Sequence, residues 1–272
     1  MTSFFRYPGG KSKLYSPIEK KLLRFGTPKL YAEPFFGGGS IGIKLLTNYS
    51  KIESIYINDK NNFIFYLWEA VISHPEILKK LILDYVPSVD SFYEIKQQLL
   101  NAEKNINIHN QITYGFLQLV IHQISYSGLG VMSGGPLGGK KQKSKYKINC
   151  RWSTKYICKK IDKIYNLFKK HNYKIYNEDF NNFITKIDSP ELMMYIDPPY
   201  YEKGNQLYQY GFTKNDHIRL SHCLKNTKSN WVLSYDDCSE IKKLYNWANI
   251  EKISINYSIN TARKKSELLI TK

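Results

Sequence analysis

Short apolar runs alternate with helical patterns near both ends of the chain. The runs typical of strands are Lys29–Phe35, Ser54–Asn58, Tyr173–Asn177, Leu192–Ile196 and Asn230–Tyr235. A helical segment, Ser40–Asn48, separates the first two of them. This alternation predicts an α/β fold with a parallel, doubly wound, Rossmann-like sheet. Ligands of such sheets bind beyond the carboxyl ends of the strands, where turns are expected after Phe35, Asn58 and Ile196.

The middle of the chain shows a helical pattern instead. The expected helices are Asn62–Ser73, Pro75–Asp84, Ser91–Glu103, Gln111–Ser125 and Thr154–His171. One long stretch rich in glycine and lysine, Tyr126–Trp152, interrupts them, and loops of that length usually carry function. We therefore predict a mainly helical subdomain, residues 62–172, inserted into an α/β domain built from residues 1–61 and 173–272.

Charge adds a candidate partner. The 272 residues hold 40 Lys and Arg against 23 Asp and Glu, a net charge of +17. Thirteen basic residues and one acid fall between Lys140 and Lys174, and Tyr146 and Trp152 lie among them. This block, which can also be a solvated basic face, favours a nucleic acid because cations bind phosphates and aromatic rings stack on bases. The expected contacts are Lys140, Lys141, Lys143, Lys145, Lys147 and Arg151.

Several classes of protein are disfavoured by what the sequence does not contain. No apolar run approaches the roughly 18 to 20 residues that span a bilayer, and the first residues do not resemble a secretory signal. The four cysteines form no zinc-like spacing. We expect free thiols, no metal, no membrane partner and a cytoplasmic location.

A glycine loop follows the first expected strand. Gly37, Gly39 and Gly42 fit the pattern G-x-G-x-x-G, and Asp59 ends the next strand. Glycines allow the backbone to approach a ligand closely, and an acid in this place accepts hydrogen bonds from ribose hydroxyls. A nicotinamide dinucleotide and S-adenosylmethionine fit these residues equally well. The simpler alternative is a tight structural turn with a surface aspartate.

The tetrapeptide Asp197-Pro198-Pro199-Tyr200 follows the apolar strand Leu192–Ile196. Two prolines end the strand and fix the backbone, so a carboxylate, a carbonyl and a ring are held together at the edge of the sheet. Such a group can accept both hydrogen bonds of a planar amine while it stacks on the attached ring. Methylation of adenine N6 requires this arrangement, although a structural Pro-Pro turn is the alternative.

Together these motifs resemble the Dam-type, D12-class family of adenine-N6 DNA methyltransferases. Six segments stand in the order of that family: Arg6–Lys11, Ala32–Ser40, Asn58–Asp59, Glu178–Phe180, Asp197–Tyr200 and Arg263–Leu269. The resemblance implies a methyltransferase fold that binds S-adenosylmethionine, with a target-recognition region in the helical insertion. It also implies double-stranded DNA as substrate, a target adenine flipped out of the helix, and direct methyl transfer.

The resemblance assigns roles to individual residues. Cofactor contacts are expected from Tyr7, Lys11, Phe35, Gly37, Gly39, Asp59, Asp179, Phe180 and Asp197. Asp197 and the carbonyl of Pro198 are expected to hold the target amine on the turn that Pro199 completes, and Tyr200 to stack on the base. The basic segment that closes the family pattern adds Arg263 and Lys264 as DNA contacts.

Two other functions compete with this interpretation. One is an NAD-dependent oxidoreductase, and the other is a DNA-binding module without catalysis. Ser127–Trp152 does not resemble the recognition loop of GATC-specific members, so GATC is only a default target sequence. We further expect a monomer or weak dimer and a separate cognate restriction endonuclease.

Overall fold

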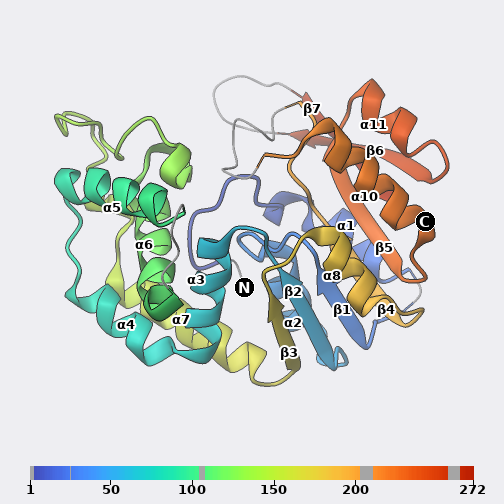
Figure 1. Cartoon of the computed structure of the whole chain (residues 1–272), viewed down its shortest axis with the longest axis horizontal. Helices are drawn as coiled ribbons and strands as arrows, with labels where there is room; N and C mark the ends of the chain where they lie inside the picture. Colours follow the sequence, from blue (N-terminus) through green and yellow to red (C-terminus); the bar gives the residue numbers. More distant parts are fainter. Residues whose placement is uncertain (1–2, 25, 104–107, 203–210, 257–263) are drawn as a thin grey trace. The chain divides into compact units, whose positions relative to one another are not determined.

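The computed structural model describes residues 3–24, 26–103, 108–202, 211–256 and 264–272. The chain divides into two compact units (Figure 1). The α/β unit consists of Lys11–Lys60 and His171–Lys272, and the helical unit of Thr2–Gly10 and Asn61–Lys170. Among the described residues, no helix has the length and apolar character needed to cross a membrane.

A single sheet organises the α/β unit. Its strands are β1 (Leu30–Glu33), β2 (Ser54–Asn58), β3 (Asn172–Tyr176), β4 (Leu192–Ile196), β5 (Asn230–Asp236), β6 (Asn249–Asn256) and β7 (Lys264–Thr271). Their order across the sheet is β3-β2-β1-β4-β5-β7-β6. The first five pair in parallel, whereas β7 runs antiparallel to both β5 and β6. The α/β, Rossmann-like fold class predicted from the sequence is confirmed.

Helices cover both faces of this sheet. They are α1 (Tyr15–Leu22), α2 (Ser40–Asn48), α8 (Phe180–Ile187), α10 (Lys214–Asn226) and α11 (Ser239–Leu244). In Figure 1, α8 and α10 lie in front of the strands, and α1 and α2 lie behind them. Every residue of the central strand β4 is buried as a result, which explains its uninterrupted apolar sequence. The polar residues that follow the strands are thereby left at the carboxyl edge.

The described residues of the helical unit form the α-helices α3 (Asn62–Ser73), α4 (Pro75–Asp84), α5 (Val89–Ala102), α6 (Gln111–Ile124) and α7 (Thr154–Phe168). Helices α3 and α6 approach each other at Gly115, where an added Cβ would lie 2.7 Å from the carbonyl oxygen of Tyr66. Between α6 and α7 the chain forms only short 3-10 turns. The long irregular stretch predicted there therefore has no regular strand or α-helix.

Two features differ from the sequence-based expectations. The strands β6 and β7 were not expected, because the expected set ended at Tyr235. In addition, Thr2–Gly10 belongs to the helical unit, whereas the expected α/β domain began at residue 1. The reason is aromatic packing: the rings of Phe4 and Phe5 lie 5.4 and 6.4 Å from that of Trp68 on α3.

Candidate functional site

The glycine loop lies at the carboxyl edge of the sheet, between β1 and α2. Gly37 and Gly39 have φ angles of 47° and 63°, a left-handed backbone that favours glycine. The Gly37 amide donates a hydrogen bond of 2.8 Å to Oδ2 of Asp59, which follows β2. The structure thus brings together the loop and the acid that the sequence paired by spacing alone.

Asn58 ties three segments of this edge together. It is 1% exposed, and its Nδ2 donates to the carbonyl oxygens of Pro34 at 2.9 Å and of Glu178 at 3.1 Å. Its Oδ1 accepts from the Glu178 amide at 2.9 Å. The glycine loop, the end of β2 and the segment after β3 are therefore held in one fixed arrangement.

A buried acid supports the glycine loop from beneath. Glu33 at the end of β1 accepts hydrogen bonds from the Tyr31 hydroxyl, 2.8 Å away, and from the Gly42 amide. Burial raises the pKa of Glu33 to about 8, although both hydrogen bonds oppose the shift. Glu33 is therefore protonated at neutral pH. Sequence reasoning missed this role, although a charged residue ending an apolar strand was a visible signal.

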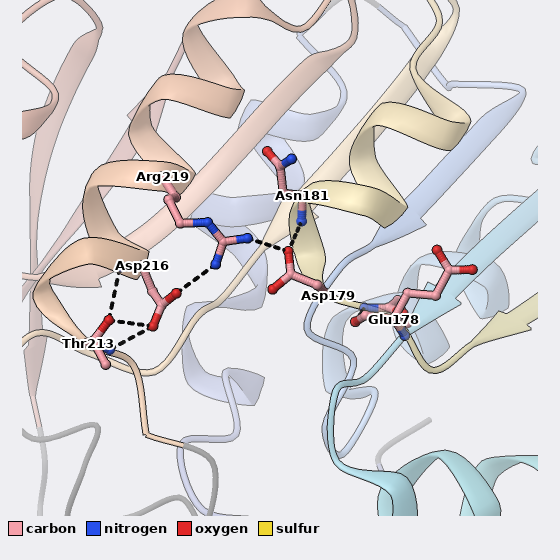
Figure 2. A network of polar contacts seen from close by, with 7 residues as sticks. Glu178, Asp179, Asn181, Thr213, Asp216 and Arg219 are labelled. Atoms are coloured by element: carbon pink, nitrogen blue, oxygen red, sulfur yellow. Dashed lines mark hydrogen bonds and ion pairs between the residues drawn. The ribbon is translucent and has the colours of Figure 1, made fainter.

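Asp179 and Arg219 form a charged network at the start of α8 (Figure 2). Oδ1 of Asp179 caps α8 by accepting from the Asn181 amide at 3.0 Å. The same oxygen lies 2.8 Å from Nη2 of Arg219, which also contacts Asp216 on its own helix α10. Arg219 therefore fixes the orientation of the Asp179 carboxylate, a role that its sequence position did not indicate.

Three phenylalanine rings gather next to this network. Phe180 lies 5.7 Å from Phe35 of the glycine loop and 5.4 Å from Phe212, between ring centroids. The guanidinium of Arg219 lies 5.0 Å from the ring of Phe180. Phe35 and Phe212 remain partly exposed. Partly exposed rings beside a carboxylate suit a planar, amine-bearing ligand such as adenine.

Asp197 follows β4 and has a partner at each carboxylate oxygen. Oδ2 lies 3.0 Å from Nζ of Lys11, whose side chain is 7% exposed, and Oδ1 accepts from the Ser234 hydroxyl at 2.8 Å. Burial raises the pKa of Asp197, and the positive charge of Lys11 opposes that shift. The structure thus joins two predicted residues, Lys11 and Asp197, and adds Ser234, which the sequence did not single out.

Tyr200 is held on both sides. Nζ of Lys11 lies 4.6 Å from the centroid of its ring, and its hydroxyl donates to Oε2 of Glu267 on β7 at 2.5 Å. Pro198 is buried between Asp197 and Tyr200, and Pro199 is partly exposed. The tetrapeptide is therefore a rigid turn whose charged and aromatic ends share one lysine. Glu267 belongs to the basic segment near the end of the chain, but its contact with Tyr200 could not be read from sequence.

The helical unit contains a second buried network. His122 on α6 is 4% exposed, its Nδ1 lies 2.8 Å from the Gly128 carbonyl oxygen, and its Nε2 lies 3.1 Å from Nε2 of Gln118. Burial lowers the pKa of His122 to about 4, so the ring is neutral. The ring of Tyr7 lies 5.5 Å from it. Tyr7, expected as a cofactor contact, is thus part of this unit, and that role stays a prediction.

The basic loop, Tyr126–Trp152, begins shortly after His122 in the chain and is held by hydrogen bonds within the loop. Gln142 accepts from the Ile148 amide at 2.8 Å and donates to the Leu137 carbonyl oxygen at 2.9 Å. All the predicted DNA contacts in the loop are exposed: Lys140, Lys141, Lys143, Lys145, Lys147 and Arg151. The cations therefore lie on the surface of a folded loop, and Lys147 also donates to the Gln142 carbonyl oxygen within it.

Two expected DNA contacts have less structural information. Arg263 lies outside the described residues, and for Lys264 only its backbone position at the start of β7 is described. Across the part of the chain that the structure describes, no group of three or more His, Cys, Asp or Glu residues could hold a metal ion.

Comparison with known proteins agrees with this geometry. The chain is 25% identical to the Type II methyltransferase M.MjaIII of Methanocaldococcus jannaschii, over 94% of this chain and 92% of that protein. A model of the D12 class N6 adenine-specific DNA methyltransferase family matches residues 7–259. A match over nearly the whole length shows that the chain belongs to the D12 class of N6 adenine-specific DNA methyltransferases.

Proposed function

We propose that this DNA adenine methyltransferase uses S-adenosylmethionine and transfers the methyl group directly to a flipped-out adenine. The observation that carries the proposal is that Lys11 and Ser234 each contact one carboxylate oxygen of Asp197, and that Lys11 also lies over the ring of Tyr200. These contacts hold a carboxylate and an aromatic ring in fixed positions before any substrate binds. Such preorganisation is the main way in which enzymes stabilise charge in a transition state.

The residues present fit the proposed cofactor. The left-handed glycines carry no Cβ and so allow a ligand to approach the backbone closely, and Asp59 follows β2 beside Gly37, as a ribose site requires. The rings of Phe35 and Phe180 lie near Asp179, as an adenine site requires. Bound S-adenosylmethionine supplies an activated methyl group on its sulfonium. Family membership favours this cofactor over NAD, which the glycine loop alone did not distinguish.

The Asp197 turn then has a defined task. The lone pair of adenine N6 is delocalised into the purine, so the amine is a poor nucleophile while it stays planar. Asp197 and the carbonyl of Pro198 accept its two N–H bonds and favour the pyramidal nitrogen of the transition state. Tyr200 stacks on the base, and the Lys11 charge beside Asp197 keeps that carboxylate in its accepting form.

Double-stranded DNA is the proposed substrate, held by the basic loop. N6 of a paired adenine is engaged and stacked inside the helix, so the target base must leave the duplex before transfer. The exposed cations of the loop carry no base-reading geometry by themselves, and phosphate contacts position DNA without specifying its sequence. We therefore keep GATC as the default target and a Type II modification role, as named for the archaeal relative, as its setting.

Methylation of mixed-sequence duplex DNA tests the proposal. We expect N6-methyladenine from labelled S-adenosylmethionine, and loss of product by about 10²-fold or more in Asp197→Ala. Asp84→Ala, which removes an exposed carboxylate at the end of α4, is the matched control and should leave the rate unchanged. Transfer that survives Asp197→Ala, or calorimetry that detects NAD but no S-adenosylmethionine, would contradict the proposal. Methylome sequencing of cells that express the chain then identifies the target sequence.

A further inference from the structure

A chain of two buried hydroxyls ends on Asp197. The Tyr195 hydroxyl on β4 lies 2.9 Å from Oγ of Ser234 on β5, and Oγ of Ser234 lies 2.8 Å from Oδ1 of Asp197. A serine hydroxyl has one proton to donate, and an ionised carboxylate only accepts. Ser234 therefore donates to Asp197, and Tyr195 must donate to Ser234. The two hydroxyl dipoles both point toward the carboxylate, an alignment that strengthens each bond.

Tyr195 and Ser234 are both buried within the sheet, where a polar side chain requires a hydrogen-bond partner. Tyr195 is 2% exposed and Ser234 is 0% exposed, and they occupy adjacent parallel strands of the sheet. Burial without hydrogen bonds would be costly for either hydroxyl. Neither belongs to the turn of residues 197–200, so the relay approaches Asp197 from inside the sheet, whereas Lys11 approaches its other oxygen.

The surroundings of Asp197 have opposing effects on its ionisation. Burial favours the protonated form, and Lys11 and Ser234 favour the carboxylate. The charge of Asp197 in turn raises the pKa of the titratable groups around it, which are Glu33, Tyr195, Tyr200, Tyr235 and Glu267. Glu33 and Glu267 each have a raised pKa through burial, so Lys11 is the main charge that opposes protonation. The hydrogen bond that Ser234 donates to Oδ1 therefore has a large influence on whether Asp197 is ionised.

We propose that Tyr195 and Ser234 form a positioning relay that keeps Asp197 ionised and fixes its orientation for the target amine. The inference rests on the proposed function, since it concerns the same carboxylate. Ser234 fixes Oδ1, Lys11 fixes Oδ2, and the remaining lone pairs accept from the substrate. Tyr195 acts only through Ser234. Neither is a catalytic residue, because neither touches the reacting atoms.

Ser234→Ala tests the first link through the pH dependence of single-turnover methylation. The variant leaves only Lys11 to oppose protonation, so the acid limb of the rate profile should move to higher pH. On the acid limb we expect the rate at a given pH to fall about tenfold relative to the wild-type enzyme, the size of one hydrogen bond to a charged group. On the plateau above that limb the rate should stay within about threefold. A uniform loss at every pH would show a merely structural role and overturn the proposal.

Tyr195→Phe tests the second link. Its acid limb should move in the same direction but by less, since the Ser234 hydroxyl remains. Combined with Ser234→Ala it should add nothing, because groups that act in series are not additive. Full additivity of the two shifts would contradict the relay.

A matched control removes a buried hydroxyl elsewhere in the same unit. Ser221 is 6% exposed and donates at 2.8 Å to a backbone carbonyl oxygen, that of Leu244, whereas Ser234 donates to a carboxylate. Ser221→Ala should lower thermal stability as Ser234→Ala does, but leave the pH profile in place. A shift in this control would attribute the effect to general destabilisation and overturn the proposal.

A second readout needs neither cofactor nor DNA. In enzyme labelled with ¹³C at aspartate Cγ, the Asp197 resonance is the one absent from Asp197→Asn. Its titration should move to higher pH in Ser234→Ala, and an unchanged titration would refute the relay. If the wild-type enzyme methylates no adenine, the proposed function fails instead. If it methylates adenine while both pH profiles of Ser234→Ala match wild type, only the relay fails.

Discussion

In each of the two units burial holds an ionisable side chain in its neutral form, an acid in one and a base in the other. In the α/β unit, burial raises the pKa of Glu33 to about 8. In the helical unit, burial lowers the pKa of His122 to about 4. Each side chain contacts the backbone of a loop or its edge: Glu33 contacts Gly42 just after the glycine loop, and His122 contacts Gly128 in the basic loop.

The difference between them lies in their neighbours. Glu33 has another carboxyl group, Asp197, close enough to act on its pKa, so its neutral form spares the site a second negative charge. His122 is surrounded by the rings of Phe5 and Tyr7 and by the amide of Gln118, and its neutral form avoids a charge among apolar groups. One neutral group therefore belongs to the electrostatics around Asp197, and the other to the packing of a loop.

The strongest test of this division is to remove the charge of the basic loop. Replacing Lys140, Lys141, Lys143 and Lys145 with glutamine should weaken DNA binding by up to about 4 × 10³-fold at 0.1 M salt. Each lost phosphate contact releases one fewer counterion and costs about eightfold at that salt. The slope of log affinity against log salt should flatten by up to about 3.6. Cofactor affinity should not change, because these four side chains project into solvent.

The control removes the same charge from the α/β unit. Lys20, Lys51, Lys225 and Lys228 are exposed, and their replacement with glutamine lowers the net charge equally. DNA affinity should then fall far less. If the loop variant instead loses cofactor binding, the basic loop supports the fold and the division between the units is wrong.

Opposite pH dependence is the second test. Between pH 4.5 and about 8 the unfolded chain has released the Glu33 proton that the folded chain retains, so Glu33 lowers stability as pH rises. Between about pH 4 and 6.5 the unfolded chain binds a His122 proton that the folded chain excludes, so His122 lowers stability as pH falls. Each slope has an upper limit of about 1.4 kcal/mol per pH unit.

The variants Glu33→Gln and His122→Gln isolate the two effects in urea unfolding at a series of pH values. The free energy of unfolding of Glu33→Gln minus that of the wild type should rise as the pH rises. The same difference for His122→Gln should rise as the pH falls. His217 in the α/β unit also has a pKa lowered to about 4 by burial, and subtraction of the wild-type curve removes its contribution. Parallel curves at every pH would show that neither group is held neutral.

The comparison also explains what the sequence could and could not reveal. Asp59 and Asp197 were identified because they follow apolar strands, and parallel strands bring their carboxyl ends to one edge. Their supporting partners were not identified, because Ser234 and Glu267 lie on β5 and β7, far along the chain, and only strand pairing brings them near. Periodicity specifies which face a residue occupies, but not which side chain lies opposite.

The helical unit shows the same limit more strongly. Its helices were predicted closely, and α3 and α4 match to the residue. The neutral state of His122 could not be predicted, since it depends on burial by Phe5. The sequence had placed Phe5 in the α/β domain, whereas the structure places it in the helical unit. The two strands β6 and β7 were missed for a related reason: an antiparallel edge pair with polar residues carries a weak apolar signal.

A third test acts on the loop above His122. Gly130 has a φ angle of 57°, and an added Cβ would lie 3.0 Å from Cε1 of His122. Gly130→Ala should cost about 2 kcal/mol of stability, from left-handed strain and crowding. Gly134 in the same loop has only open space around an added Cβ, so Gly134→Ala should be neutral or slightly stabilising. Equal effects in thermal unfolding would mean that the loop does not rest on His122.

The smallest expected effect is at Gly42, which lies against Glu33 in the α/β unit as Gly130 lies against His122 in the helical unit. An added Cβ there would lie 2.5 Å from Oε1 of Glu33 and 3.1 Å from the ring of Phe36. Alanine improves helix propensity by about 1 kcal/mol, so displacement of the Glu33 carboxyl is opposed by a gain in α2. We expect a net loss of about 1 kcal/mol in Gly42→Ala, from crowding of about 1–3 kcal/mol.

The sign of that effect should reverse once Glu33 is shortened. In a Glu33→Ala background no carboxyl remains to be displaced, so Gly42→Ala should stabilise the protein by up to about 1 kcal/mol through helix propensity. Urea unfolding of the four proteins at pH 6 measures this double-mutant cycle. A loss of the same size in both backgrounds would mean that Phe36, not Glu33, limits the space beneath the glycine loop. The buried acid would then hold its loop by the hydrogen bond to Gly42 alone, whereas His122 holds the basic loop by contact with its ring.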